Sequence, residues 1–185
     1  FTPVAHPTWE PGPPSDEAIE LARVVDRGLR SAEILDMEDL AIITGEKVWL
    51  VFVDLFVLNY DGNLIDASAA GALAALMNTS KPIYKIKKEK AELTEKTEKL
   101  NILKKPLAVT LAKIGDKFVV DPSADEEEVL DTRLTISLDE DNNIVSLQKS
   151  GSEGFTKEEF IQAMNIAVDK AEEIRKIVEE SLNVE

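Results

Sequence analysis

Apolar residues recur at helical spacing in two segments of the chain. After the prolines of residues 11–14, Ser15 or Asp16 is expected to cap a helix that runs to about Ile34. Further along, Thr156 followed by Glu159 has the pattern of a capping box at the start of a last helix. The apolar stripes of the two segments are Ala18, Leu21, Val24, Val25, Gly28, Leu29 and Ala32, and Phe160, Ala163, Met164, Ala167, Ala171, Ile174 and Val178. Both stripes predict amphipathic helices that pack on a core.

Other segments have strand or buried-helix patterns. Residues 48–60 are β-branched, aromatic and apolar on both sides, which predicts a long central strand. Residues 66–77 are small and apolar, which predicts a buried helix. Short strands are expected at 82–88, 107–114, 117–120, 133–138 and 144–149, with hairpin turns at 115–116 and 142–143 and an exposed loop or hairpin at 89–99. The order predicts an α+β fold, with helices on a mostly antiparallel sheet, over a single domain 1–185.

Composition narrows the class of protein. The chain has 185 residues, a net charge of -15 and no cysteine, which excludes a disulfide scaffold and a thiolate zinc site. The absence of cysteine fits a reducing compartment, and we expect a cytoplasmic protein without a membrane span. The acidic balance argues against general nucleic-acid affinity, so any RNA contact needs a local basic patch. The chain starts at Phe1 without methionine, and we expect residues to be missing before it.

The first predicted helix gathers three of the five arginines of the chain. Arg23, Arg27 and Arg30 lie within about 60° on the face opposite the apolar stripe. One interpretation is a solvated face whose arginines pair with Glu20, Asp26 and Glu33. The other is phosphate binding, for which the guanidinium fork is better suited than the ammonium group of lysine.

Other candidate groups are weaker. Asp121, Asp125, Glu126, Glu127, Glu128 and Asp131 form an acidic cluster that could bind a hard cation, or could be an acidic loop between strands. We expect no metal site and no cofactor. His6 is the single histidine, which argues against triad chemistry and a histidine zinc site. Trp9 and Trp49 are expected in the core.

Several segments together resemble the RNase PH superfamily. They are "AIELARVVDRGLR", "KVWLVFVDLFVLNYDGNLIDAS", "FVVDPSADEEEVLDTRLTIS" and "SLQKSG". The resemblance covers nearly the whole chain except the charged residues 89–99, and is greatest to non-catalytic ring subunits of the archaeal exosome. It implies an RNase PH-like (ribosomal protein S5 domain 2-like) fold, N-terminally truncated here, and a six-membered ring that alternates with a catalytic RNase PH-like subunit. It also implies RNA-binding cap subunits, and RNA degraded from its 3′ end by phosphate.

The resemblance also assigns residues. Active relatives carry a Ser/Thr-Arg pair that grips phosphate where this chain has Leu64 and Ile65, so we expect no catalytic residue. Asp131 matches the second catalytic carboxylate, and Glu127 or Glu128 could match the first, in a loop about two residues shorter. Arg23 and Arg27 match RNA-contacting positions, and Arg30 lies one turn further. The alternatives are an active phosphate-dependent 3′–5′ exoribonuclease, and an acidic interaction module with a solvated arginine face.

Overall fold

The computed structural model describes residues 1–87 and 90–182. Four helices lie within them: α1 (Asp16–Ser31), α2 (Leu64–Asn78), α3 (Ala124–Val129) and α4 (Lys157–Leu182). The strands are β1 (Ala41–Ile43), β2 (Lys47–Val48), β3 (Ser80–Lys87), β4 (Lys90–Lys99), β5 (Leu107–Ile114), β6 (Lys117–Val120), β7 (Thr132–Leu138) and β8 (Ile144–Gly151). The predicted α+β class with antiparallel sheets is confirmed. In this part of the chain, no helix has the length and apolar character needed to cross a membrane.

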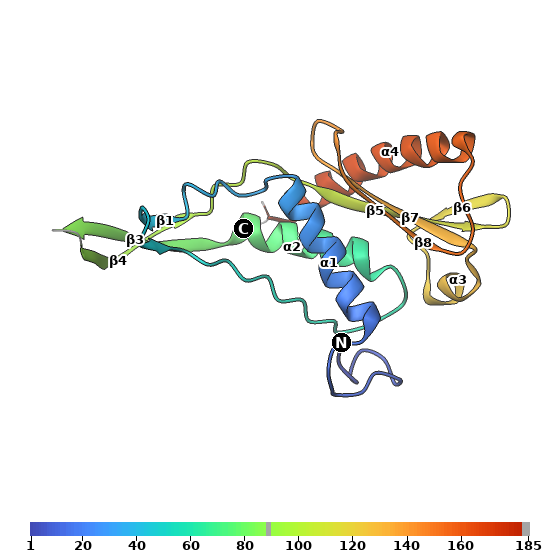
Figure 1. Ribbon diagram of the computed structural model, residues 1–185, viewed down its shortest axis with the longest axis horizontal. Helices are drawn as coiled ribbons and strands as arrows, with labels where there is room; N and C mark the ends of the chain where they lie inside the picture. The colour runs from blue at the N-terminus through green and yellow to red at the C-terminus, as the bar shows by residue number, and fades with distance from the viewer. Residues whose placement is uncertain (88–89, 183–185) are drawn as a thin grey trace.

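The body of the molecule is a four-stranded antiparallel sheet covered on both faces. Its strand order is β6-β5-β7-β8, with β8 at an edge. Leu134, Ile136 and Leu138 of β7 pack with alanines of α4 in one core cluster, while Ala108 of β5 packs with α1 and α2 in another. Because neighbouring residues of a strand face opposite sides, β7 is apolar toward α4 and polar toward α1. Figure 1 shows α4 on one side of this sheet and α1 and α2 on the other.

The predicted helices form with the caps that the sequence indicates. The Ser15 side chain accepts a hydrogen bond from the backbone of Ala18, and Thr156 and Glu159 form the expected reciprocal pair. α1 ends at Ser31, three residues before the expected end. Gly28 allows α1 to lie close to the sheet, because a Cβ there would stand 3.3 Å from Ser137 Oγ. The Ser15 cap thus fixes the start of α1, and Gly28 lets the helix pack closely on the polar face of the sheet.

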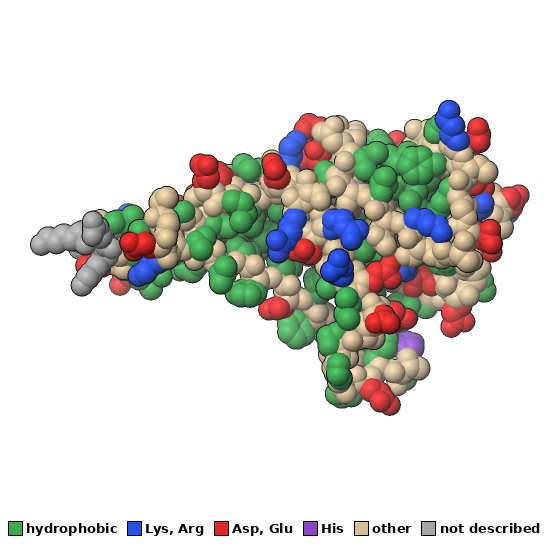
Figure 2. Space-filling view, in the orientation of Figure 1, with side chains coloured by type: hydrophobic (Ala, Val, Ile, Leu, Met, Phe, Trp, Pro, Cys, Tyr) green, Lys and Arg blue, Asp and Glu red, His purple; other side chains and the backbone are tan. Residues whose placement is uncertain are grey.

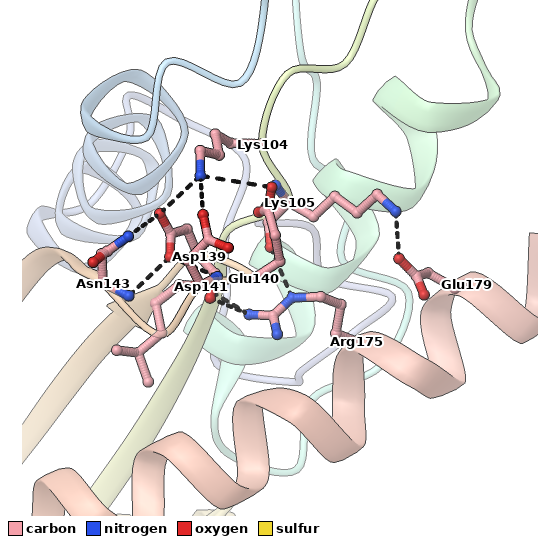
Figure 3. Close-up of polar contacts among 9 residues, drawn as sticks. Lys104, Lys105, Asp139, Glu140, Asp141, Asn143, Arg175 and Glu179 are labelled. Carbon is pink, nitrogen blue, oxygen red and sulfur yellow. Dashed lines mark hydrogen bonds and ion pairs between the residues drawn. The ribbon is translucent and has the colours of Figure 1, made fainter.

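A buried arginine fixes α4 to the far side of the body. Arg175 donates from Nε to the carbonyl of Lys105 at 3.0 Å, and from Nη2 to the carbonyls of Leu138 and Asp139 at 3.1 and 2.9 Å. Figure 3 shows this guanidinium beneath a cluster of charged side chains around Lys104. Burial acts to raise the pKa of Asp139, but hydrogen bonds from Asn143 and the charge of Lys104 outweigh it and lower that pKa. We interpret the cluster around Lys104 and Arg175 as structural, because its charged groups are paired with one another or hydrogen-bonded to the backbone.

β3 and β4 form a hairpin that extends away from the body (Figure 1). At its base the buried Lys81 binds Asp39 at 2.7 Å and Glu98 at 3.4 Å. A loop or hairpin was predicted at 89–99, and β4 at 90–99 forms the second strand of this hairpin. Residues 88 and 89 lie outside the described residues. The other strand predictions and the turns at 115–116 and 142–143 are confirmed within two residues.

The predicted central strand at 48–60 is wrong. β2 ends at Val48, and residues 49–60 form no strand, although most of their side chains are apolar. Leu50, Phe52, Phe56 and Leu58 are 72%, 80%, 79% and 80% exposed. The physical reason is that a strand requires a neighbouring strand for its backbone hydrogen bonds, and none of the described residues supplies one here.

Candidate nucleic-acid interface

The three arginines lie on the solvent side of α1, as predicted. The helix buries Leu21, Val24, Val25 and Gly28 and exposes Arg23, Arg27 and Arg30. Figure 2 shows basic side chains gathered over α1 in the middle of this face. We call Arg23, Arg27 and Arg30 the arginine ridge. It is a local positive surface on a chain whose net charge is -15.

The arginines of the ridge differ in what neutralises them. Arg30 Nε is bound to Asp26 Oδ1 at 2.7 Å in an exposed i,i+4 ion pair. Arg27 donates from Nη1 to the neutral Gln148 Oε1 at 2.9 Å. Arg23 makes no hydrogen bond or ion pair with any residue that the structure describes. Only Arg30 is therefore compensated by an acid, and the interpretation as a self-paired helix face holds for one arginine of three.

Glu20 does not neutralise the ridge, because it faces the sheet. Its carboxylate accepts a hydrogen bond from Ser150 Oγ at 2.7 Å and lies 3.5 Å from Arg133 Nη2. Glu33 makes no ion pair with an arginine that the structure describes. Arg23 and Arg27 thus keep their full charge and donors for an anionic ligand.

A pocket of about 520 Å³ lies beside the N-terminal ends of α1 and α2. Its lining includes Leu64 and Ile65, which stand where the resemblance implies that active relatives carry the phosphate-binding Ser/Thr-Arg pair. Ile65 is buried and packs in the core cluster with Leu21 and Val24. Neither side chain carries a donor for an anion. Four glutamates also line the pocket: Glu17, Glu20, Glu127 and Glu128. The pocket lining also contains Arg133, which lies 3.5 Å from both Glu20 and Glu127, so the lining is negatively charged overall, unlike that of a phosphate site.

Two of the three carboxylates that could match catalytic acids, Glu127 and Asp131, bind other groups of the protein, whereas the third, Glu128, lines the pocket. Glu127 accepts hydrogen bonds from the Tyr60 hydroxyl at 2.8 Å and the Asn63 backbone at 3.2 Å, and lies 3.5 Å from Arg133 Nη1. Burial, and then this hydrogen bond, raise the pKa of Tyr60 to about 12, which keeps the phenol protonated as a donor. Asp131 accepts from the backbone of Gly115, at the turn between β5 and β6. Glu127 and Asp131 are thus each held by hydrogen bonds from neighbouring groups.

The acidic cluster contains a short helix and no assembled cation site. Ser123 and Glu126 form a capping box at the start of α3, so the expected loop between strands is partly helical. Asp121 accepts from the side chain of Asn63, while Glu127 and Asp131 point to the partners described above. Among the described residues, no group of three or more acidic, histidine or cysteine side chains could hold a metal ion.

One buried carboxylate links α2 to the sheet below the pocket. Asp66 accepts from the backbone and hydroxyl of Thr110, both at 2.7 Å, and from the Asn63 side chain at 2.9 Å. Burial raises the pKa of Asp66 to about 6, although these hydrogen bonds act in the opposite direction. The group holds the start of α2 against β5 and is enclosed, so it is not available to a ligand.

The two tryptophans and His6 have no part in the ridge. Trp49 packs against a core cluster and contacts Tyr84, as the core prediction requires. Trp9 instead stacks on Phe1 at 4.2 Å and lines the pocket with His6. Its expected place in the core is wrong, since residues 1–14 pack on the surface of the body.

Gln148 is the residue that sequence reasoning missed. It lies 121 residues from Arg27 in the chain, and only the placement of α1 on β8 brings the two together. The one available signal was the alternation of polar residues, Ser146, Gln148 and Ser150, along an expected strand.

Two family models and several known proteins are similar in sequence to this chain. Residues 1–82 match a model described as 3′ exoribonuclease family, domain 1, and residues 105–170 match domain 2 of the same family. The exosome complex component Rrp42 of Pyrococcus furiosus is 48% identical over 96% of this chain and 65% of its own length. Rrp42 of Thermococcus onnurineus is 46% identical over 100% of this chain and 69% of its own length.

A solved structure of an archaeal exosome is also similar to this chain in fold and in sequence. A chain of the Archaeoglobus fulgidus exosome, with RNA bound to the active site, superimposes with a TM-score of 0.85 at 44% identity, covering 95% of this chain and 67% of that one. The chain thus spans about two thirds of the length of these relatives. It belongs to the RNase PH-type 3′ exoribonuclease family, in the group of the archaeal Rrp42 exosome components.

Proposed function

We propose that this chain is part of a non-catalytic ring subunit of an archaeal exosome, which holds RNA near the active site of a catalytic partner subunit. The substrate is RNA with a single-stranded 3′ end, and the reaction is phosphorolysis that releases nucleoside diphosphates. Arg23 and Arg27 bind phosphates of the RNA backbone, with Arg30 in a secondary role.

The observation that supports RNA binding is the uncompensated charge of the ridge. Arg23 has no partner among the described residues and Arg27 has a neutral one. Guanidinium groups on one helix face bind successive phosphates well, because each offers several donors in a planar fork. The strongly acidic remainder of the chain limits RNA contact to this surface.

The residues that line the pocket support the proposal that this subunit has no catalytic activity. Phosphorolysis requires that inorganic phosphate is positioned and that its charge is neutralised. Leu64 and Ile65 offer no donor, and the neighbouring glutamates would repel phosphate. The chemistry therefore belongs to the partner subunit, while this subunit supplies structure and RNA contacts.

The remaining parts of the proposal concern assembly. The subunit alternates with its catalytic partner in a hetero-hexameric ring, which carries RNA-binding cap subunits and acts in the cytoplasm. We also propose that residues 1–185 form one N-terminally truncated RNase PH-like domain. In support, α2 packs on α1, on β5 and on α4 and so links the segments matched by the two family models.

The experiment compares the full-length form of this protein alone and mixed with its catalytic partner, on a short RNA with a single-stranded 3′ end. Release of nucleoside diphosphates is measured with and without inorganic phosphate. We expect none from the subunit alone and phosphate-dependent release from the mixture. Phosphate-dependent release by the subunit alone would show an active exoribonuclease and overturn its non-catalytic role.

A further inference from the structure

The sheet face beneath α1 presents polar side chains from the edge strand β8. Ser150 Oγ donates to Glu20 at 2.7 Å, and Gln148 Oε1 accepts from Arg27 at 2.9 Å, so alternate residues of β8 reach up to α1. The arginine ridge therefore does not end at the helix. It continues onto β8 through the contact between Arg27 and Gln148.

The orientation of the Gln148 amide follows from the chemistry of its partner. A guanidinium can only donate hydrogen bonds, so the amide oxygen must face Arg27 and the amide nitrogen must point elsewhere. The two N–H groups of Nε2 have no acceptor among the residues that the structure describes. Gln148 thus brings an unused donor to the same surface as the Arg27 guanidinium.

The neutrality of Gln148 matters for the charge of the ridge. Asp26 binds Arg30 with a full negative charge, which competes directly with any anionic ligand. Gln148 restrains the Arg27 side chain without cancelling its charge. Holding a long side chain in one orientation before binding reduces the conformational entropy lost when a phosphate is bound.

We propose that Gln148 extends the RNA-contacting surface from α1 onto β8, where its amide oxygen positions Arg27 and its amide nitrogen donates to an oxygen of the RNA. This rests on the proposed function, because it requires that the ridge binds RNA. Gln148 is a positioning residue for Arg27 and a direct contact for the ligand.

The test measures the affinity of the assembled full-length ring for single-stranded RNA at several salt concentrations. Gln148→Met removes both amide functions at similar size, and we expect about fivefold weaker binding, as for one lost hydrogen bond. Gln148→Glu keeps the acceptor but adds charge beside Arg27, so we expect at least about tenfold weaker binding. Its salt slope should also fall by about 0.7, the value for one phosphate contact of a single strand.

Gln162 supplies the matched control, since it is an exposed glutamine of α4. Gln162→Met and Gln162→Glu should bind RNA like the wild type, and thermal melting should show that all four variants fold. If both Gln148 variants bind RNA like the wild type while Arg23→Ala with Arg27→Ala binds weakly, the inference about Gln148 is wrong and the proposed function stands. If the double arginine variant also binds like the wild type, both are wrong.

Discussion

Arg30 is bound to Asp26 one helical turn earlier, with 2.7 Å between Nε and Oδ1. The two side chains are 81% and 58% exposed, so the pair contributes little to stability. Its effect is on the ridge, since a carboxylate beside the guanidinium compensates one of its three positive charges. Arg23 and Arg27 have no such acid, which ranks them above Arg30 as RNA contacts.

Asp26→Asn should release Arg30 for RNA. We expect RNA affinity of the assembled ring to rise about two- to fivefold at low salt, with a salt slope steeper by up to about 0.7. Fluorescence anisotropy titrations at several salt concentrations measure both quantities. Asp169→Asn on α4 makes the same change of net charge away from α1 and should leave both unchanged. Equal effects of the two substitutions would mean that net charge, and not the ridge, controls binding.

Asp66 should make the stability of the fold depend on pH. Its pKa is raised from 3.8 to about 6 in the folded chain, so the folded state binds more protons than the unfolded state between these values. The contribution of Asp66 to the free energy of unfolding is therefore fully present below pH 3.8 and is lost as the pH rises through about 6. The loss is on the order of 3 kcal/mol.

Asp66→Asn isolates this contribution, because an amide can keep the hydrogen bonds to Asn63 and Thr110 if the hydroxyl of Thr110 reverses its direction. Urea unfolding of both proteins from pH 4 to pH 8 gives the comparison. The variant should gain stability relative to the wild type as the pH rises. A constant difference across this range would show that Asp66 titrates normally.

Gly62 is required by the turn that leads into α2. Its φ is +91°, and a Cβ there would lie 2.3 Å from the carbonyl oxygen of Pro122. Gly62→Ala should therefore lower the free energy of unfolding by more than about 3 kcal/mol. Gly71→Ala is the matched control, since Gly71 lies in α2 with nothing within 4 Å of a new Cβ. It should be stabilising by about 0.5–1 kcal/mol.

The apolar segment 49–58 should make the isolated 185-residue chain associate. Phe52 and Phe56 are 80% and 79% exposed, and a surface of this kind attracts other apolar surfaces. Replacing both with lysine should reduce binding of a hydrophobic dye and concentration-dependent association in sedimentation, with little change in melting temperature. Leu55→Lys should instead lower the melting temperature, because Leu55 packs against a core cluster. Unchanged association in the double variant would mean that another surface is responsible.

Local patterns were sufficient to predict three of the four described helices, α1, α2 and α4, and the hairpins. Ser15, Thr156 and Glu159 predicted their helix starts because capping depends on neighbours in sequence. Residues 49–60 were predicted wrongly, because a strand depends on a partner that the pattern cannot supply. The short α3 was missed although Ser123 and Glu126 carry the capping-box spacing, since the run of acids suggested a loop.

For the site, sequence placed the arginines on one helix face but not their partners. The pairing of Asp26 with Arg30 was predictable from i,i+4 spacing. The turn of Glu20 toward the sheet and the contact of Gln148 with Arg27 depend on tertiary packing of α1 on β8.

The most direct test of an RNA-holding, non-catalytic subunit is phosphate-dependent degradation of a 3′ single-stranded RNA by the full-length ring carrying Arg23→Ala and Arg27→Ala. We expect at least about tenfold slower degradation at subsaturating RNA, as two phosphate contacts are lost. A ring with Arg30→Ala should lose much less, since Arg30 is already paired with Asp26. Full activity of the double variant would contradict the role of the arginine ridge and return it to a solvated helix face.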